Sequence, residues 1–305
     1  MRDARVVRRR GALADSPRLL DAMVAAALVF IVAFVGYPVF YNLVMSFQEV
    51  ALGNLRDFWR PFAGLANYAA LLADPAFALV ALNTLVFTAA NVVLQMVLGF
   101  ALALFFNLDF PGARWMRGLI LAGWILPPLV IAAIFKWLFA TNGGLVNEAL
   151  MGTGLLARPA TFLSDPASAM PIVIGTNVWF GMPFSMILIS AGLSNLPREV
   201  YEAAAIDGAG PVQRFVRITL PLMAPTLFAV LCLSTIYTLR AFDVIWGMTG
   251  GGPVNATLTF PVWSFQFSFQ QFAFGQGAAI ATLMFVFVIG VCVIYIRSLK
   301  TEVRL

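Results

Sequence analysis

The chain has 305 residues, of which 61% are hydrophobic and only 11% are charged, less than half of the roughly 25% typical of soluble domains. So few charges cannot cover a water-soluble surface, and the composition therefore predicts an integral membrane protein. The two cysteines, Cys232 and Cys292, are too few for a disulfide scaffold and lie in apolar runs, where cysteine acts as a small buried hydrophobe. Because histidine is absent, His-based catalysis and metal ligation are excluded, and we expect no catalytic residue and no metal site.

Six apolar stretches are long enough to cross a bilayer. A helix needs about 20 apolar residues to span about 30 Å of hydrocarbon. The stretch between Asp243 and Arg297 is longer than one helix, and its glycine-rich beginning at 248–253 predicts a loop before the last helix. We therefore expect an all-α polytopic membrane protein with transmembrane helices at 22–41, 79–106, 118–137, 172–191, 219–239 and 274–296.

The placement of lysine and arginine predicts the topology. The two termini and the loops after the second and fourth predicted helices hold 14 of the 19 basic residues, whereas the loops on the opposite side hold three. Cytoplasmic segments carry such an excess, so we expect both termini in the cytoplasm. The chain then consists of a basic N-terminal segment at 1–20, which most simply contacts anionic lipid, and a transmembrane domain at 21–305. The net charge of +5 indicates topology rather than a nucleic-acid partner.

The basic run Arg8-Arg9-Arg10 before the first apolar stretch also fits a signal peptide or, weakly, a twin-arginine export signal. The stretch is long enough to span the membrane and lacks a short apolar core followed by a small-residue cleavage site. The pattern therefore favours an uncleaved first transmembrane helix over a removable signal.

The predicted helices lack the groups that drive several classes of transporter. Their central parts hold no Asp, Glu, Lys, Arg or His, whereas proton-coupled carriers keep such a residue in the membrane. Few intramembrane carboxylates also argue against a membrane enzyme. The two lysines, Lys136 and Lys300, lie in no P-loop motif, so the chain cannot bind ATP through a P-loop of its own. Energy for any active transport must come from another protein.

The loop at 195–221 has an unusual helical pattern. Pro197 suits a first helical position, 198–206 favours a short helix through its three consecutive alanines, and Gly208 is suited to ending it. Pro211 is suited to beginning a second helix that continues into the fifth span. The loop predicts a helix–turn–helix elbow whose small, flat face fits docking to another protein; an amphipathic helix lying at the lipid interface also fits.

This loop resembles the EAA motif of permease subunits of bacterial binding-protein-dependent ABC importers, through Glu202-Ala203-Ala204, Asp207-Gly208-Ala209, Phe215, Ile218, Leu220-Pro221 and Pro225. Further positions resemble the carbohydrate-uptake branch, most of all its maltose F-type and glycerol-phosphate A-type permeases. These positions are Tyr37-Pro38, Ser46-Phe47, Gly64-Leu65, Asn67-Tyr68, Asn83-Thr84, Leu126-Pro127 and the run 242–253. The resemblance covers nearly the whole chain after its first twenty residues.

The resemblance implies a type I ABC importer permease fold in the bacterial inner membrane and an ATP-driven sugar importer. It implies three partners: a second, nonidentical permease, two ATPase subunits that bind the ATP, and an extracytoplasmic solute-binding protein. It also implies that the elbow is the coupling helix, with ATPase contacts at Glu202, Ala203, Ala204, Asp207 and Gly208. No cofactor is expected on this chain itself.

Polar and aromatic residues of the fourth and fifth spans are candidates for a substrate pathway. Asn177, Gly181 and Phe184 share one helical face by their spacing, and so do Ser234 and Tyr237. Aromatic faces with amide and hydroxyl groups suit a neutral saccharide. The resemblance points to the same two helices, so the predicted pathway comprises Asn177, Phe180, Gly181, Phe184, Ser234 and Tyr237, with Trp179 and Thr238 as further candidates; helix packing is the alternative role for all of them.

Several alternatives remain open. One is a permease of the same family for glycerol-3-phosphate or a polyol. A charged substrate such as glycerol-3-phosphate needs cationic groups at the pore, and Arg240 and Lys136 are the ones near enough. We interpret Arg240 and Asp243 as a neutralised local pair, which favours a neutral sugar. An ATP-independent carrier or channel is more remote. Outside the membrane, the segments Asn67-Tyr68 and 249–253 could each either contact the binding protein or simply connect helices. The glycine-rich loop at 249–253 is also suited to act as a gate, because glycine permits backbone movement.

Overall fold

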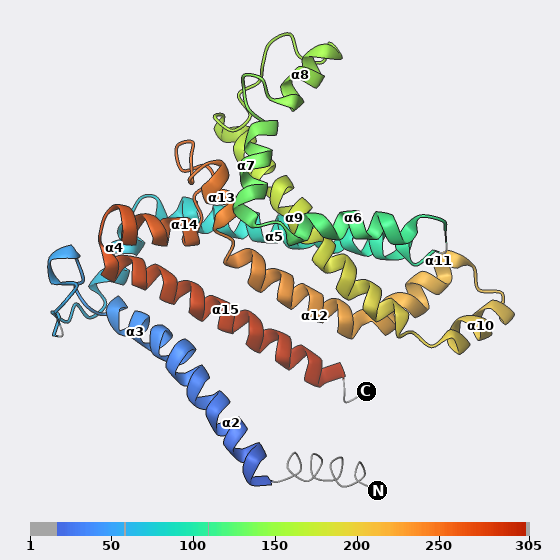
Figure 1. Ribbon diagram of the computed structural model, residues 1–305, viewed down its shortest axis with the longest axis horizontal. Helices are drawn as coiled ribbons and strands as arrows, with labels where there is room; N and C mark the ends of the chain where they lie inside the picture. Colours follow the sequence, from blue (N-terminus) through green and yellow to red (C-terminus); the bar gives the residue numbers. More distant parts are fainter. Residues whose placement is uncertain (1–16, 58, 109, 303–305) are drawn as a thin grey trace, which may run out of the picture.

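The protein is described here by a computed structural model that covers residues 17–57, 59–108 and 110–302. Most of the predicted basic segment at 1–20 therefore lies outside the described residues. The regular secondary structure of the described part is helical apart from two isolated bridges, and loops join the helices (Figure 1). Its first half contains α2 (Pro17–Ile31), η1 (Val32–Gly36), α3 (Tyr37–Ser46), η2 (Leu52–Asn54), α4 (Ala66–Ala73), α5 (Phe77–Phe106), α6 (Ala113–Ile125), α7 (Pro128–Leu138) and α8 (Leu145–Gly152).

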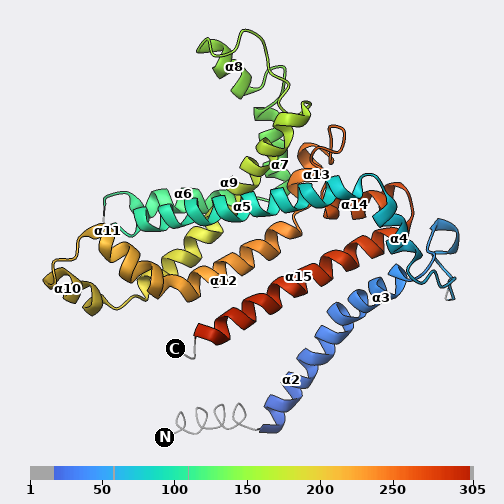
Figure 2. The same cartoon turned by 180° about the vertical axis from the view of Figure 1, so that it is seen from behind.

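The second half contains the elbow and the last three spans. Its elements are α9 (Pro166–Ser194), α10 (Arg198–Ile206), α11 (Pro211–Arg214), η3 (Phe215–Thr219), α12 (Leu220–Leu239), α13 (Asp243–Met248), α14 (Phe260–Phe265), η4 (Gln266–Gln270) and α15 (Phe274–Glu302). The first described residues and the end of α15 lie at the end of the bundle away from α4, α8 and α13 (Figures 1 and 2). Both ends of the described chain therefore share one side, as an even number of spans requires.

Five helices are long and apolar enough to cross a membrane by themselves: Leu20–Ser46, Phe77–Phe106, Pro166–Ser194, Pro211–Leu239 and Phe274–Tyr295. They confirm the first, second, fourth, fifth and sixth predicted spans. The fourth begins six residues earlier than predicted because the Asp165 side chain accepts a hydrogen bond from the amide of Ala167 and caps α9. A search for apolar runs misses such polar starts.

The third predicted span, 118–137, is wrong as a single helix. The structure has two helices there, α6 and α7, that are bent by 100°. Leu126 and Pro127 between them are extended, because proline restricts the preceding residue and lacks the amide hydrogen that a continuous helix needs. Pro127 and Pro128 stood in the middle of the predicted span, so the sequence did carry the signal for this break.

Two spans contain a widened turn of π-helix, η1 in the first and η3 in the fifth. Each is followed within two residues by a proline, Pro38 after η1 and Pro221 after η3. A proline in a regular helix clashes with the carbonyl four residues earlier, and a π-turn changes that spacing. The two spans thus continue past their prolines, as predicted for the passage from Pro211 into the fifth span.

The centre of the bundle is the contact between α5 and α9. A side-chain carbon placed on Gly99 of α5 would lie 2.7 Å from Cβ of Ser185 on α9, so only glycine permits this approach. Buried apolar side chains form one cluster around α5, α13, α14 and the first half of α9, and a second around the other ends of α5 and α9 with the start of α12. The spans that carry the predicted pathway are therefore held at close range.

The first span stands apart from this bundle (Figure 1). None of its most apolar window is buried, and its contacts concentrate at α3, where Asn42 Nδ2 donates to Ala278 O at 3.3 Å and to Thr282 Oγ1 at 3.2 Å. The part of this span before α3 has no buried residue within the described chain, and its surface is left for lipid or for another protein.

Helices α7 and α8 form a side arm of the bundle (Figure 2). One buried amide closes this arm. The side chain of Asn147 is fully buried. Its Nδ2 donates to Ala140 O and Ala160 O, both at 3.0 Å, and its Oδ1 accepts from Ala160 N at 2.9 Å. This residue ties the two ends of the arm together.

Asn147→Ala is expected to loosen this arm while the spans stay folded. The change leaves buried carbonyl groups without a hydrogen-bond donor, which costs about 2 kcal/mol. The equilibrium constant for local opening of the arm should therefore increase about thirtyfold. Limited proteolysis of the 140–165 segment measures this opening. Thr153→Ala, which removes only local hydrogen bonds at the exposed end of α8, should digest like the native chain; equal rates for the two variants would contradict the prediction.

Candidate functional site

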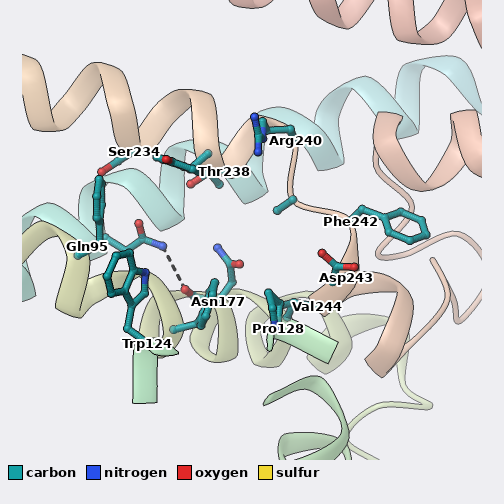
Figure 3. Close-up of a pocket in the computed structure, with 15 residues that line it drawn as sticks. Gln95, Trp124, Pro128, Asn177, Ser234, Thr238, Arg240, Phe242, Asp243 and Val244 are labelled. Carbon is teal, nitrogen blue, oxygen red and sulfur yellow. Dashed lines mark hydrogen bonds between the residues drawn. The ribbon is translucent and has the colours of Figure 1, made fainter. Parts of the chain in front are cut away.

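All six predicted pathway residues line one pocket of ≈ 290 Å³, together with Thr238. Asn177, Phe180, Gly181 and Phe184 come from α9, whereas Ser234 and Tyr237 come from α12. Figure 3 shows Asn177, Ser234 and Thr238 around the same space. The structure thus brings the candidates together, while their contact with a substrate stays a prediction.

A row of aromatic rings forms the apolar wall of the pocket. Phe184 lies between Trp124 and Tyr237, with ring centroids 5.6 Å and 5.4 Å away. Trp124 comes from α6 and was not expected in the site, since its range was predicted as an unbroken span. Flat aromatic faces of this kind suit the C–H faces of a sugar ring.

The polar wall is a ladder of amides between α5 and α9. Asn177 Nδ2 donates to Asn91 Oδ1 at 2.8 Å, and Asn91 Nδ2 donates to Phe87 O at 2.7 Å. Gln95 Nε2 donates to Asn177 O at 3.1 Å (Figure 3). These bonds fix the orientation of Asn177 and leave its Oδ1 without a donor within the described chain.

Gly181 permits this arrangement, because a side-chain carbon there would lie 2.6 Å from Cδ of Gln95. Sequence reasoning missed Gln95, which lies in the uncharged second span without a pattern to single it out. Trp179, by contrast, lies outside the pocket lining: its indole packs against Gly123 and Phe135. Trp179 therefore does not share the pocket with the other candidates and packs α9 against α6 and α7, while its role in a pathway stays a prediction.

Arg240 and Asp243 both line the far end of the pocket (Figure 3). Their interpretation as a neutralised pair is wrong, because their charged atoms do not come within the 4.0 Å of an ion pair. The Arg240 guanidinium instead lies over the Tyr237 ring, 5.5 Å from its centroid. The helix break between α12 and α13 separates the two charged groups, which the short spacing in the sequence did not reveal. The pocket therefore has both a strong donor and a strong acceptor at one end.

Asn177→Ala and Tyr237→Ala are each expected to lower transport about fivefold if the pocket is the pathway. Each removes one polar or stacking contact worth about 1 kcal/mol. Uptake of labelled solute into vesicles measures this loss. Leu233→Ala, at an exposed position of α12 outside the pocket, is the control. Normal uptake in both pocket variants would contradict the assignment.

The elbow has the predicted form. Helix α10 spans Arg198–Ile206, as predicted, with Pro197 as its N-cap rather than as its first helical residue. Gly208 has a φ of +78°, in the left-handed region that glycine adopts without strain. After Pro211 the chain continues through α11 and η3 into α12. The break at Gly208 therefore sets the angle between α10 and the fifth span.

The two faces of α10 differ. Glu202, Ala203, Asp207 and Gly208 are exposed, and Ala204 is half-buried. Tyr201 faces the bundle, where its hydroxyl hydrogen-bonds Thr219 Oγ1 at 2.8 Å. The elbow is thus bonded to η3 at the start of the fifth span and presents the predicted coupling residues outward.

The loop residues proposed for binding-protein contact are held by internal bonds. Asn67 Nδ2 donates to Ser46 O and Gln48 O, both at 2.9 Å, and the Tyr68 hydroxyl pairs with Ser46 Oγ at 2.7 Å. In the glycine-rich loop, Thr257 Oγ1 donates to Gly252 O at 2.7 Å, and Gln266 Nε2 donates to Gly250 O at 3.2 Å. These bonds fix both segments to the bundle, which favours a structural role for these side chains.

Residues 95–299 match the model of a protein family described as the binding-protein-dependent transport system inner membrane component. The chain belongs to this family. The match covers α5 from Gln95 onward, the pocket, the elbow and the last two spans. The permease is therefore a multi-pass inner-membrane protein, as its five or six candidate spans indicate.

Curated relatives agree over most of the chain. The permease is 34% identical over 93% of its length to the sulfoquinovosyl glycerol transport system permease protein of Agrobacterium fabrum, 92% of which is covered. It is 36% identical over 78% of its length to the trehalose/maltose transport system permease protein of Thermococcus litoralis, covering 80% of that protein. It is 34% identical over 98% of its length to the diacetylchitobiose uptake system permease protein of Streptomyces coelicolor, covering 90%.

Solved structures share the fold. The permease aligns with a chain of a bacterial ABC transporter involved in import of the acidic polysaccharide alginate, with a TM-score of 0.78 and 21% identity over 95% of this chain and 99% of that one. A second structure of such a transporter, in complex with an alginate-bound periplasmic protein, gives the same score over 91% and 92%. The predicted ABC importer permease fold is confirmed.

Proposed function

We propose that this permease imports a neutral sugar or oligosaccharide, handed over by a solute-binding protein and driven by ATP hydrolysis on partner ATPases. The observation that supports this proposal most is that all six predicted pathway residues line one and the same pocket. The names of the similar permeases, which include trehalose/maltose and diacetylchitobiose transporters, favour a saccharide.

The pocket chemistry fits a hydroxyl-rich solute. Its aromatic row offers faces for a sugar ring, and Asn177, Ser234 and Thr238 offer hydrogen bonds. At the far end, Arg240 donates and Asp243 accepts, so a diol finds both kinds of partner. A similar permease of Yersinia pestis is named for sn-glycerol-3-phosphate. For an anionic solute, however, the Asp243 carboxylate in the same pocket is unfavourable, which supports the neutral sugar.

The chain itself is proposed to have neither catalytic activity nor a cofactor. It carries no P-loop motif in its sequence, and no cluster of three or more metal-ligating side chains occurs among the described residues. ATP therefore belongs to two partner ATPases, one of which binds α10 of this chain around Glu202, Ala203, Ala204, Asp207 and Gly208. Movement of this rigid elbow passes to α12 through Pro211 and the Tyr201–Thr219 bond and changes access to the pocket.

The second permease is proposed to be a similar but nonidentical chain. The uncovered first span and the open side of the pocket, where Tyr237 is 55% exposed, both need another surface. Lipid covers part of the first span, whereas a polar pocket at membrane depth requires a protein wall. A paired permease supplies that wall and completes the pathway.

Copurification tests this proposal directly. The tagged chain is purified from its native membrane in mild detergent, and its partners are identified by mass spectrometry. We expect an ATPase and a second permease with the native chain, and loss of the ATPase from a Glu202→Lys, Gly208→Pro variant. A native chain that comes alone, or a variant that keeps the ATPase, would show that the proposed assembly or docking site is wrong.

A further inference from the structure

A second polar pocket lies at the elbow, remote from the substrate pathway. It is a cavity of ≈ 440 Å³ where the ends of α5 and α9 meet α10 and η3. Five polar side chains line it, and none of them belongs to the predicted pathway or coupling sets. They are Asn107, Ser194, Arg198, Tyr201 and Thr219.

The chemistry of this lining suits an anion. Arg198 is the charged residue of the lining and makes no hydrogen bond or ion pair with the described part of the chain. Its guanidinium offers a planar fork of donors that matches phosphate oxygens. Tyr201 and Thr219, whose hydroxyls are bonded to each other at 2.8 Å, provide a fixed polar edge beside it. Glu199 and Glu202, the nearest carboxylates in the sequence, lie outside the lining.

The same pocket has an apolar side, which indicates an amphiphile rather than a free ion. Leu104, Leu193 and Leu196 complete its wall, and they lie at helix ends where a membrane span meets the polar elbow. A free phosphate gains nothing from three leucines, whereas the glycerol and first methylene groups of a lipid bury apolar surface against them.

The surroundings favour a lipid with net negative charge. Four further arginines, Arg114, Arg117, Arg214 and Arg217, lie on α6, α11 and η3 around the elbow. Basic side chains at the membrane surface attract anionic headgroups. Glu199, Glu202 and Asp207 on and after α10 offset part of this charge, but the arginines outnumber them, so the elbow stays positive. Within it, one pocket combines an unpaired guanidinium, hydroxyl groups and an apolar wall.

We propose that this pocket binds the headgroup phosphate of an anionic phospholipid, with Arg198 and the Tyr201 hydroxyl donating to the phosphate oxygens. With the lipid bound, the Thr219 hydroxyl donates to Tyr201 in place of its long bond to Arg214 O at 3.5 Å, which leaves the Tyr201 hydrogen for the phosphate. The leucines contact the start of the acyl chains. The bound lipid packs α10 against the ends of α5 and α9 and so stiffens the elbow. Because Glu202, Ala203 and Asp207 are exposed and absent from the pocket lining, lipid and ATPase occupy different surfaces of α10.

Native mass spectrometry of the full chain in mild detergent tests the site. The probes are phosphatidylglycerol and phosphatidylcholine with the same acyl chains. We expect the native chain to retain phosphatidylglycerol at least fivefold better than phosphatidylcholine. Arg198→Gln should lower that retention about tenfold, and Arg198→Lys should keep most of it. Arg217→Gln, an exposed arginine of the elbow outside the pocket, is the matched control and should bind like the native chain.

Three outcomes overturn the proposal: equal retention of the two lipids, equal retention by Arg198→Gln and Arg217→Gln, or displacement of phosphatidylglycerol by excess inorganic phosphate. The last result would assign the pocket to a soluble phosphate. Thermal unfolding in detergent verifies that Arg198→Gln is folded. If this variant does not fold, retention by Arg198→Lys and the comparison of the two lipids on the native chain still decide the test. Lipid retention is measured without transport, so this result does not depend on the proposed sugar import.

Discussion

Gly208→Val is expected to reduce ATP-driven uptake at least about tenfold and to weaken the retention of the ATPase during purification. Gly208 has a φ of +78° and nothing within 4 Å of the position where a side chain would begin. Valine therefore meets no steric obstacle there, and its effect comes from the backbone. A left-handed conformation costs about 1–2 kcal/mol for a residue with a side chain, which shifts a conformational ratio by about tenfold. A rotation of α10 relative to α12 would relieve this backbone strain.

Gly210→Val provides a control two residues away. Gly210 also has open space around it, but its φ of −69° and ψ of 167° are extended values that valine adopts readily before a proline. The two variants add the same side chain to the same exposed loop and differ in backbone strain. Uptake by Gly208→Val within twofold of Gly210→Val would show that the angle of the elbow does not matter for coupling.

The sequence predicted most of the fold because membrane spans leave a strong compositional signal. Five spans and the helix at 198–206 were predicted correctly, since uncharged length, alanine content and the Gly208 stop are local properties. The third span failed because a search for apolar length gave no weight to Pro127 and Pro128 inside the run. Helix ends such as Asp165 were missed for a related reason, as capping residues are polar and lie outside apolar windows.

The pathway candidates were gathered from residue type and helical spacing, which explains both what was found and what was missed. Asn177, Gly181 and Phe184 share a face in any helix, so their common pocket followed from geometry. Gln95 and Trp124 lie on other helices, and their approach depends on tertiary packing that one sequence does not reveal. The Arg240–Asp243 pair failed because the helix break between them separates neighbours in the chain.

Gly181→Leu is expected to reduce uptake more than tenfold while the ATPase still copurifies, whereas Gly208→Val is expected to reduce uptake and also weaken retention of the ATPase. Gly181 lies between Asn177 and Phe184 on the pocket wall, and a side chain there meets the amide of Gln95. Leucine both occupies part of the ≈ 290 Å³ pocket and displaces the amide that bonds Asn177 O. Overpacking of this kind costs about 1–3 kcal/mol, so thermal unfolding in detergent must accompany the uptake measurement.

Gly175→Leu separates a blocked pathway from a damaged helix. Gly175 lies on the same α9, is exposed and has nothing within 4 Å of a new side chain. This variant should therefore transport normally.

If Gly181→Leu unfolds, the double variant with Gln95→Ala makes room for the leucine and leaves it in the pocket. A folded Gly181→Leu chain, single or double, that transports like Gly175→Leu would remove this pocket from the pathway. Loss of uptake together with loss of the ATPase would instead mean that the change reaches the elbow through α9, because only three residues separate the end of α9 from the start of α10.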